Sequence, residues 1–316
     1  MRIIFMGTSS FGVPILKKLI DLRKDIVAVI TQPDRPCGRG KKTQPSPIKT
    51  VALQSDLNVI QPEDINDKKT ISEIRRLQPD LIILVAYGQI LSSQVLKLPS
   101  KGCLNIHPSL LPKYKGPAPI NWTLIKGEEE TGITFLFMNE KIDAGDVIFQ
   151  KRIKILPGEN FEELHSRLAA QSAQLLPEVL LAVEKGEYKK IPQPKEKYFY
   201  ARKLCKEDCR IDWNQNSKEV VNLIRGLTFL PCAYTEYKGK RIKIVEAVRS
   251  ERLEEPKKVL RQQPGTIVEL SKNGIMVLAG DGNMVTIKKV IPAGSQEMDA
   301  SEFINGYQMK TGDSFQ

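Results

Sequence analysis

Three side chains near the middle of the chain have the types and the spacing that acyl transfer requires. Asn105 and His107 lie two positions apart at the end of an apolar run at residues 103–106, and Asp143 follows a second apolar run at residues 133–138. Residues two apart on an extended strand point to the same face, so Asn105 and His107 are expected to lie side by side. Asn105, His107 and Asp143 could therefore meet where the first strand ends.

The chemistry of such a group follows from its donors and acceptors. An asparagine amide and a histidine ring that converge can donate hydrogen bonds to an oxyanion, while a carboxylate can orient the ring or take a proton, directly or through water. No serine or cysteine nucleophile is needed if the substrate brings an amine. A polar residue at a strand end is more often a cap or turn residue, so the assignment of Asn105, His107 and Asp143 as catalytic depends on the surrounding motif.

That motif resembles the folate-dependent formyltransferases. It reads N-x-H-P-S-L-L-P-x-Y-x-G-x-x-P from Asn105, then T-G-I-T from Thr131 and D-x-G-D from Asp143. The resemblance implies 10-formyltetrahydrofolate as co-substrate, without a metal. It also implies a folate pocket formed by two runs of residues: Ser109, Leu110, Leu111 and Pro112, and Leu84, Val85, Ala86, Tyr87, Gly88 and Ile90.

Two further features narrow the resemblance to members of that family that act on initiator tRNA. Residues 32–42 read QPDRPCGRGKK, and a second domain follows the first. The similarity covers essentially the whole chain. It implies transfer of the formyl group to the α-amine of methionyl-initiator tRNA, which gives N-formylmethionyl-tRNA for translation initiation, so that initiator tRNA and folate are the expected partners.

The segment at residues 32–47 is an insertion, because a doubly wound fold usually has a connection of about two to six residues there. Its basic residues outnumber the single acid, Asp34, and are Arg35, Arg39, Lys41 and Lys42. A charged loop is often only a solvated surface. A long basic loop beside an active site is better explained by nucleic-acid binding, and the resemblance implies contact with the acceptor end of the tRNA. Further expected tRNA contacts are Lys203, Lys238 and Arg241.

Composition limits the remaining possibilities. The chain has 316 residues with 41% hydrophobic and 27% charged residues, which suits two globular domains, and its net charge of +11 favours a polyanionic partner. Two histidines and five cysteines without a CxxC pair disfavour a metal site. The sequence starts directly with an expected strand, and no apolar run approaches the about 18 residues of a membrane helix. We therefore expect a cytoplasmic protein without a membrane anchor. We also expect a monomer.

Apolar runs and helical patterns alternate in the first half of the chain. Strands are predicted at residues 2–6, 25–31, 57–61, 81–86, 103–106, 133–138 and 147–155. Helices are predicted at residues 11–22, 70–77, 88–96 and 160–184. Continuous apolar strands between helices indicate an α/β domain with a doubly wound, mostly parallel sheet, whose ligands bind at the carboxyl ends of the strands.

The second half changes to strands separated by glycine turns. A helix at residues 217–225 is followed by strands at residues 234–237, 241–248, 266–270, 275–279 and 284–290. This pattern predicts a small β-barrel of the OB type. The expected organisation is a catalytic domain at residues 1–188, a linker rich in proline and lysine at residues 189–205, and an OB-like tRNA-contacting domain at residues 206–316.

Three other functions fit the sequence less well. A formyltransferase for the amine of a sugar nucleotide or ribonucleotide would not need the basic insertion or the second domain. A non-enzymatic RNA-binding protein would leave the grouping of Asn105, His107 and Asp143 unexplained. A nicotinamide oxidoreductase is disfavoured because the turn GTSSFG at residues 7–12 lacks the middle glycine of GxGxxG.

Overall fold

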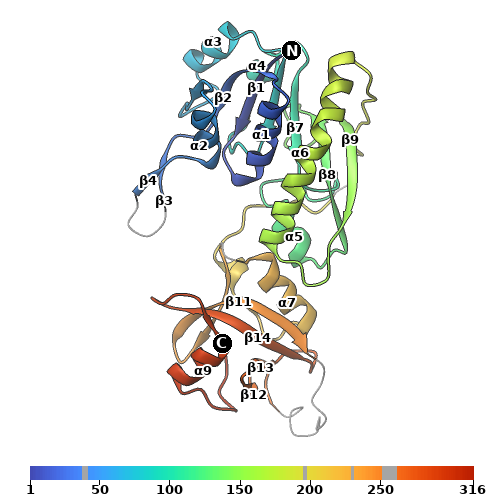
Figure 1. Cartoon of the computed structure of the whole chain (residues 1–316). Coiled ribbons are helices and arrows are strands. Elements are labelled where there is room, and N and C mark those ends of the chain that lie inside the picture. The colour runs from blue at the N-terminus through green and yellow to red at the C-terminus, as the bar shows by residue number, and fades with distance from the viewer. Residues whose placement is uncertain (38–41, 195–197, 229–230, 251–261) are drawn as a thin grey trace. The chain divides into compact units, whose positions relative to one another are not determined.

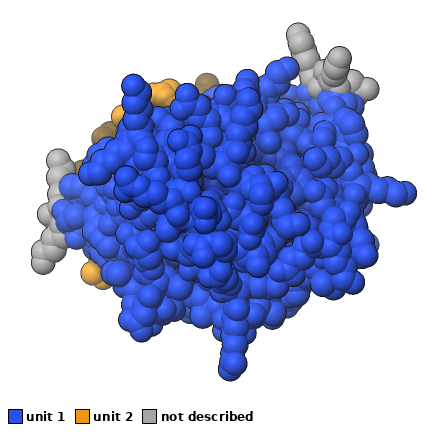
Figure 2. All heavy atoms as spheres, turned by 90° about the horizontal axis from the view of Figure 1, so that it is seen from above, with its two compact units in different colours: residues 1–119, 130–154, 165–202 blue, residues 120–129, 155–164, 203–316 orange. Residues whose placement is uncertain are grey.

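The chain forms two compact units. The computed structural model describes residues 1–37, 42–194, 198–228, 231–250 and 262–316. Unit 1 contains residues 1–119, 130–154 and 165–202, and unit 2 contains residues 120–129, 155–164 and 203–316. Figure 2 colours unit 1 blue and unit 2 orange. The polypeptide therefore enters unit 2 twice for short segments before its long final stretch.

Unit 1 is built on a seven-stranded sheet (Figure 1). Its strands are β1 (Arg2–Gly7), β2 (Asp25–Ile30), β5 (Val59–Ile60), β6 (Leu81–Val85), β7 (Cys103–His107), β8 (Glu130–Phe137) and β9 (Val147–Lys154). The order is β5-β2-β1-β6-β7-β8-β9, in which β5 to β7 are parallel and β8 and β9 are antiparallel to their neighbours. The prediction of a mostly parallel sheet is confirmed.

Helices cover both faces of this sheet, because successive side chains of its central strands are buried and apolar on both faces. They are α1 (Val13–Asp21), α2 (Pro47–Gln54), α3 (Lys68–Arg76), α4 (Ser93–Leu96) and α6 (Phe161–Lys185), with a 3-10 turn η1 (Ser10–Gly12) before α1. Ile4 and Met6 of β1 belong to the same core cluster as Ile71 of α3. Phe5 faces the other side, where its ring and the Ile48 side chain of α2 both lie beside Gly12.

Two segments of unit 1 differ from their predicted structure. Residues 88–96 do not form one helix: Ala86 and Gly88 have positive φ angles of 45° and 93°, and α4 is limited to Ser93–Leu96. The basic insertion contains an antiparallel hairpin of β3 (Arg35–Cys37) and β4 (Lys42–Gln44), which projects from unit 1 in Figure 1. The unpredicted helix α2 follows it because the Ser46 hydroxyl accepts a hydrogen bond from the Lys49 amide and caps the helix.

Unit 2 contains a six-stranded antiparallel sheet. Its strands are β10 (Ala233–Tyr237), β11 (Lys240–Ser250), β12 (Ile267–Ser271), β13 (Gly274–Leu278), β14 (Met284–Pro292) and β15 (Met298–Asp299). The order is β10-β11-β14-β13-β12, and β15 pairs with β14. The described pairings do not join β10 to β12, so the antiparallel sheet is confirmed and closure into an OB-like barrel is not.

Helices from distant parts of the sequence complete unit 2. They are α5 (Pro119–Ile125), α7 (Ser217–Gly226) and α9 (Ala300–Tyr307), with a 3-10 turn η2 (Glu207–Cys209). The Asn121 side chain of α5 donates a buried hydrogen bond of 2.8 Å to the carbonyl of Gly226. A Cβ atom at Gly226 would lie 2.8 Å from the Ile125 side chain, so the glycine permits this close approach. None of the helices in the described parts of the chain is long and apolar enough to span a membrane.

Candidate active site

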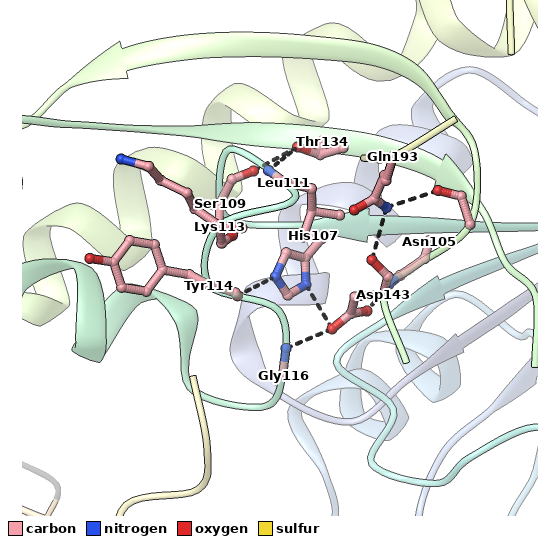
Figure 3. Close-up of polar contacts among 11 residues, drawn as sticks. Asn105, His107, Ser109, Leu111, Lys113, Tyr114, Gly116, Thr134, Asp143 and Gln193 are labelled. Atoms are coloured by element: carbon pink, nitrogen blue, oxygen red, sulfur yellow. Dashed lines mark hydrogen bonds and ion pairs between the residues drawn. The ribbon is translucent and has the colours of Figure 1, made fainter. Parts of the chain in front are cut away.

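The carboxyl end of β7 carries two of the predicted catalytic side chains, and the loop after β8 carries the third. Asn105 and His107 are both buried on β7. The Asn105 amide donates a 3.0 Å hydrogen bond from Nδ2 to Oδ1 of Asp143, and Nδ1 of His107 lies 3.6 Å from Oδ2 of the same carboxylate. Figure 3 shows the three side chains directed toward one another. The structure therefore brings the trio together.

The orientation of the His107 ring is fixed by a backbone carbonyl. Its Nε2 lies 3.0 Å from the carbonyl oxygen of Tyr114. A carbonyl can only accept, so Nε2 carries a hydrogen and Nδ1 is the nitrogen that faces Asp143. The ring can therefore act on a substrate only through Nδ1, which accepts a proton when the ring is neutral and donates a hydrogen bond when it is protonated.

Asp143 is held by several donors in an uncommon backbone conformation. Its φ angle is 48°, in the left-handed region that residues other than glycine rarely adopt. Its Oδ2 accepts a 2.8 Å hydrogen bond from the Gly116 amide, and its Oδ1 accepts the bond from Asn105. Burial lowers the pKa of the nearby Lys115 side chain, and the charge of Asp143 opposes that effect. The carboxylate is thus positioned from both β7 and the loop that follows it.

Gly145 allows the loop carrying Asp143 to lie against β8. A Cβ atom at Gly145 would lie 1.7 Å from the carbonyl oxygen of Phe137, a distance that no side chain can occupy. The loop is also tied to a later part of the chain: Nε2 of Gln193 donates to the carbonyls of Asp143 and Gly145 at 2.9 and 2.8 Å. Residue 193 lies in the stretch that the sequence predicted to be a linker.

The SLLP segment after His107 is fastened to β8 through Thr134. The Thr134 hydroxyl donates to the carbonyl of Ser109 at 2.6 Å and accepts from the amide of Leu111 and from the Gln150 side chain. Gly132, two residues earlier on β8, leaves room for the Leu110 side chain, because a Cβ there would lie 2.4 Å from it. The T-G-I-T motif is therefore the surface on which the SLLP segment packs.

Replacing Thr134 by valine should test this anchor. The change keeps the shape of the side chain but removes the hydroxyl that Ser109, Leu111 and Gln150 share, so we expect the free energy of unfolding to fall by about 1–3 kcal/mol in urea titrations. Thr131 provides the control. It is buried on the same strand, and its hydroxyl has no hydrogen-bond partner among the described residues, so Thr131→Val should change stability little. An equal fall in the free energy of unfolding of both variants would contradict the role of the Thr134 hydroxyl as an anchor.

Among the described residues, neither Cys103 nor Ser109 has surroundings that would activate it as a nucleophile. Burial raises the pKa of the Cys103 thiol to about 12, which keeps it protonated at neutral pH. The buried Ser109 hydroxyl donates to the carbonyl of Lys113 at 2.8 Å, so its hydrogen faces an acceptor that cannot remove it. Attack by an amine of the substrate fits these surroundings better than formation of an acyl-enzyme.

A cleft of about 120 Å³ opens beside Asn105 and Asp143. Its walls come from the turn after β6, from β7 and β8, and from the loop after β8: Leu84, Gln89, Ile90, Leu91, Asn105, Leu136 and residues 138–145. The walls are therefore mainly apolar, with the amide and carboxylate at one side. The contributions of Leu91, Leu136 and residues 138–142 were not predicted from the sequence.

The ten residues predicted to contact folate do not all lie at this cleft. Leu84 and Ile90 line it, while Leu111 and Pro112 line a separate cavity of about 390 Å³ next to residues 147–150 and 191–194. The remaining six line neither cavity: Val85, Ala86, Tyr87, Gly88, Ser109 and Leu110. Val85, Tyr87 and Ser109 are buried in the protein interior. Their contact with folate stays a prediction.

The predicted tRNA-binding residues are distributed over both units. Arg35 is exposed on β3, and Lys42 begins β4. Arg39 and Lys41 lie outside the described residues. The other three belong to unit 2, where all are exposed: Lys203, Lys238 and Arg241.

The hairpin of β10 and β11 carries two of these cations over aromatic rings. The Nζ atom of Lys238 lies 4.8 Å from the centre of the Tyr237 ring and 3.2 Å from Oδ2 of Asp313. The Arg241 guanidinium lies 4.2 Å from the centre of the Tyr234 ring. Both cations are exposed despite these contacts, so they remain open to an anionic partner.

In the described parts of the chain, no cluster of three or more His, Cys, Asp or Glu residues could hold a metal ion.

Comparison with known proteins assigns this chain to a class. A family model described as formyl transferase matches residues 1–180, and one described as formyl transferase, C-terminal domain, matches residues 203–308. A sugar 3N-formyl transferase, WlaRD, solved in the presence of dTdp and 5-N-Formyl-THF, shares the fold with a TM-score of 0.67 at 17% identity, over 94% of this chain and 99% of that one. The chain is thus a formyl transferase in fold and domain composition.

HypX from Aquifex aeolicus, solved in complex with tetrahydrofolic acid, has a TM-score of 0.65 at 20% identity. The match covers 99% of this chain but 48% of that one, so the chain spans about half of HypX. Full-length relatives are more similar. Methionyl-tRNA formyltransferases from Acetivibrio thermocellus and Moorella thermoacetica are 41% and 42% identical over 99% of this chain, and over 99% and 98% of their own lengths. The chain therefore belongs to the methionyl-tRNA formyltransferase family.

Proposed function

We propose that the protein transfers the formyl group of 10-formyltetrahydrofolate to the α-amine of methionyl-initiator tRNA, acting as a monomer in the cytoplasm. The observation that carries this proposal is the placement of Asn105 and Asp143 at the wall of an apolar cleft, with His107 beside them. The full-length similarity to methionyl-tRNA formyltransferases identifies the acceptor.

The reaction begins when the neutral amine attacks the formyl carbon. The electron pair of the carbonyl double bond moves onto oxygen, and the new carbon–nitrogen bond gives a tetrahedral oxyanion. Asn105 can donate to this oxygen because its amide has two hydrogens and Asp143 uses one of them. Protonated His107 can donate through Nδ1, the nitrogen that the Tyr114 carbonyl leaves facing the site.

Asp143 then assists the movement of protons. It takes a proton from the attacking amine, directly or through water. The oxyanion then re-forms the carbonyl double bond, the bond between the formyl carbon and N10 of the folate breaks, and the proton held at Asp143 passes to N10, directly or through water. The products are the formylated amine and tetrahydrofolate. The cleft walls from Leu84, Ile90 and the loop at residues 138–145 suit the flat, largely apolar faces of the folate ring system.

The basic hairpin and the C-terminal domain would hold the tRNA. We assign residues 1–188 to catalysis, residues 189–205 to a linker, and residues 206–316 to an OB-like domain that contacts tRNA. Arg35 of the hairpin and Lys238 and Arg241 of unit 2 are exposed cations, and the chain carries a net charge of +11. Such contacts supply affinity that depends on salt.

One assay tests the proposed function. The protein is incubated with 10-formyltetrahydrofolate and one of three acceptors: charged initiator tRNA, an amino-sugar nucleotide, or glycinamide ribonucleotide. We expect release of tetrahydrofolate and formylation with the charged tRNA alone. Formylation of either small nucleotide in place of the tRNA would overturn the assignment of the acceptor, and no formyl transfer to any acceptor would overturn the chemistry.

A salt series on two variants tests the role of the basic insertion. If Arg39 uses its planar, forked guanidinium on the tRNA, Arg39→Lys should lower both affinity and turnover, because lysine cannot reproduce two parallel hydrogen bonds. Lys42→Ala should weaken binding and reduce the slope of log Kd against log salt by about one unit. Steady-state kinetics from low to moderate salt would measure both. Wild-type behaviour of both variants would make the insertion a solvated surface.

A further inference from the structure

Gln193 contacts the catalytic loop from a part of the chain that the proposed mechanism does not use. Its Nε2 donates to the carbonyl oxygens of Asp143 and Gly145, at 2.9 and 2.8 Å. The two bonds use both hydrogens of the side-chain amide. In Figure 3 the Gln193 side chain reaches the backbone of the loop close to the Asp143 carboxylate.

The amide can have only one orientation at this position. Both neighbouring atoms are carbonyl oxygens, so the nitrogen and not the oxygen of the amide must face them. The oxygen, Oε1, is buried and accepts no hydrogen bond from the described residues. A buried carbonyl without a partner costs about 1–3 kcal/mol. The Gln193 side chain thus supplies both of its amide hydrogens to the loop carbonyls, while its own carbonyl oxygen stays without a hydrogen bond from the described residues.

The backbone around Gln193 is held in place on unit 1. Ile191 and Val147 exchange two backbone hydrogen bonds, each of 2.9 Å. Pro192 and Pro194 flank the glutamine, and each restricts its own φ angle and the conformation of the residue before it. Because this backbone is already restrained, little conformational entropy is lost when the Gln193 side chain is fixed in one direction.

The loop needs such support because Asp143 occupies the left-handed region, at a φ angle of 48°. Within the loop, Asn139 binds the amide of Lys141 and the carbonyl of Ala144. The carbonyls of Asp143 and Gly145 are instead bound by Gln193. Without Gln193, these carbonyls could find another hydrogen-bond donor only if their peptide groups rotated. Such a rotation would also turn the Asp143 carboxylate away from Asn105.

We propose that Gln193 is a positioning residue for formyl transfer, which acts by holding the backbone of Asp143 so that its carboxylate meets Asn105 and His107. This inference rests on the proposed function. It adds a residue of the predicted linker to those that support catalysis. Displacement of a catalytic group by about 1 Å can cost about 100-fold in rate. Gln193 does not itself line the cleft and reaches it only through the backbone carbonyls of Asp143 and Gly145, so its effect should fall on turnover more than on substrate binding.

Kinetics of Gln193→Glu test the proposal, since glutamate has the same shape but no amide hydrogens. We expect kcat to fall by about 10- to 100-fold with KM for folate and for charged tRNA nearly unchanged. Gln171→Glu is the matched control: Gln171 is half-buried in α6, and its Oε1 also has no partner among the described residues. The control should keep wild-type kcat, and a fall in kcat in the control of the same size would overturn the proposal.

A double-mutant cycle separates a positioning role from an independent one. If Gln193 acts through Asp143, Gln193→Glu should change the single-turnover rate by less than about twofold in the Asp143→Asn background, because the group that it positions no longer takes part in proton transfer. A further loss equal to that in the wild-type background would overturn the proposal.

Hydrogen exchange gives a readout that does not depend on the identity of the acceptor. Amides of residues 139–146 should exchange faster in Gln193→Glu, while those of β7 should exchange as in the wild-type protein. Unchanged exchange in the loop would contradict the proposal even if activity fell. An inactive wild-type protein whose variant shows faster loop exchange would instead place the failure in the proposed function.

Discussion

Asp143→Asn should lower the turnover number for formyl transfer by about two to four orders of magnitude, the range observed when an acid–base or oxyanion-stabilising group is removed. The asparagine has the same shape and can still accept the hydrogen bond from the Gly116 amide through its oxygen. It cannot take a proton from the attacking amine, and it offers an uncharged group to Nδ1 of His107. Folding should therefore survive while the chemistry fails.

Rapid-quench kinetics at saturating folate and charged tRNA would measure this loss, with thermal unfolding as the test of folding. Glu178→Gln, at an exposed carboxylate of α6, controls for the removal of one negative charge. His107→Ala and Asn105→Ala should also lower turnover, since each removes a donor to the oxyanion. A folded Asp143→Asn enzyme with wild-type turnover would show that Asp143 takes no part in proton transfer.

Gly145→Ala should damage both stability and activity, because the new methyl group has no space. It would lie 1.7 Å from the carbonyl oxygen of Phe137 and 2.8 Å from its carbon, both backbone atoms at the end of β8. The loop must move away from the strand, and Asp143 moves with it. We expect a loss of about 2–4 kcal/mol in the free energy of unfolding and at least about 100-fold in kcat.

Urea titrations and single-turnover kinetics on the same preparations would test this expectation. Gly306→Ala is the control, because Gly306 lies in α9 without a positive φ angle, and a methyl group added there would meet nothing within 4 Å. Alanine in a helix should stabilise the protein by up to about 1 kcal/mol. A Gly145→Ala enzyme with wild-type stability and turnover would mean that the loop has a second conformation equally suited to catalysis.

The parts of unit 1 that could be predicted are those in which residues close together in the sequence determine the local structure. The apolar runs at residues 2–6 and 81–86 indicated buried strands, because each has strand length and lies next to a predicted helix. The spacing of Asn105 and His107 placed both side chains on one face of a strand. Asp143 reaches this pair because β8 pairs with β7, a contact between separate segments that the spacing of residues does not specify.

Other features depend on contacts between residues far apart in the sequence. The bonds from Gln193 to the loop at Asp143 join residues about 50 positions apart, and the segment around Gln193 has no periodicity that could indicate them. The break before α4 follows from positive φ angles at Ala86 and Gly88, although apolar spacing continues through residues 88–96. Closure of the C-terminal sheet depends on which edge strands pair, which alternation of apolar residues does not specify.

The division of the chain between the two units limits how this enzyme could be recombined with a relative. Residues 120–129 and 155–164 group with residues 203–316 and not with the segments on either side of them. A hybrid joined at residue 202 would take Asn121 and Ile125 from one parent and Gly226 from the other, although these residues share a hydrogen bond and a close packing contact. A well-packed exchange of the C-terminal unit therefore requires three grafted segments from the same donor, and a single crossover point does not supply them.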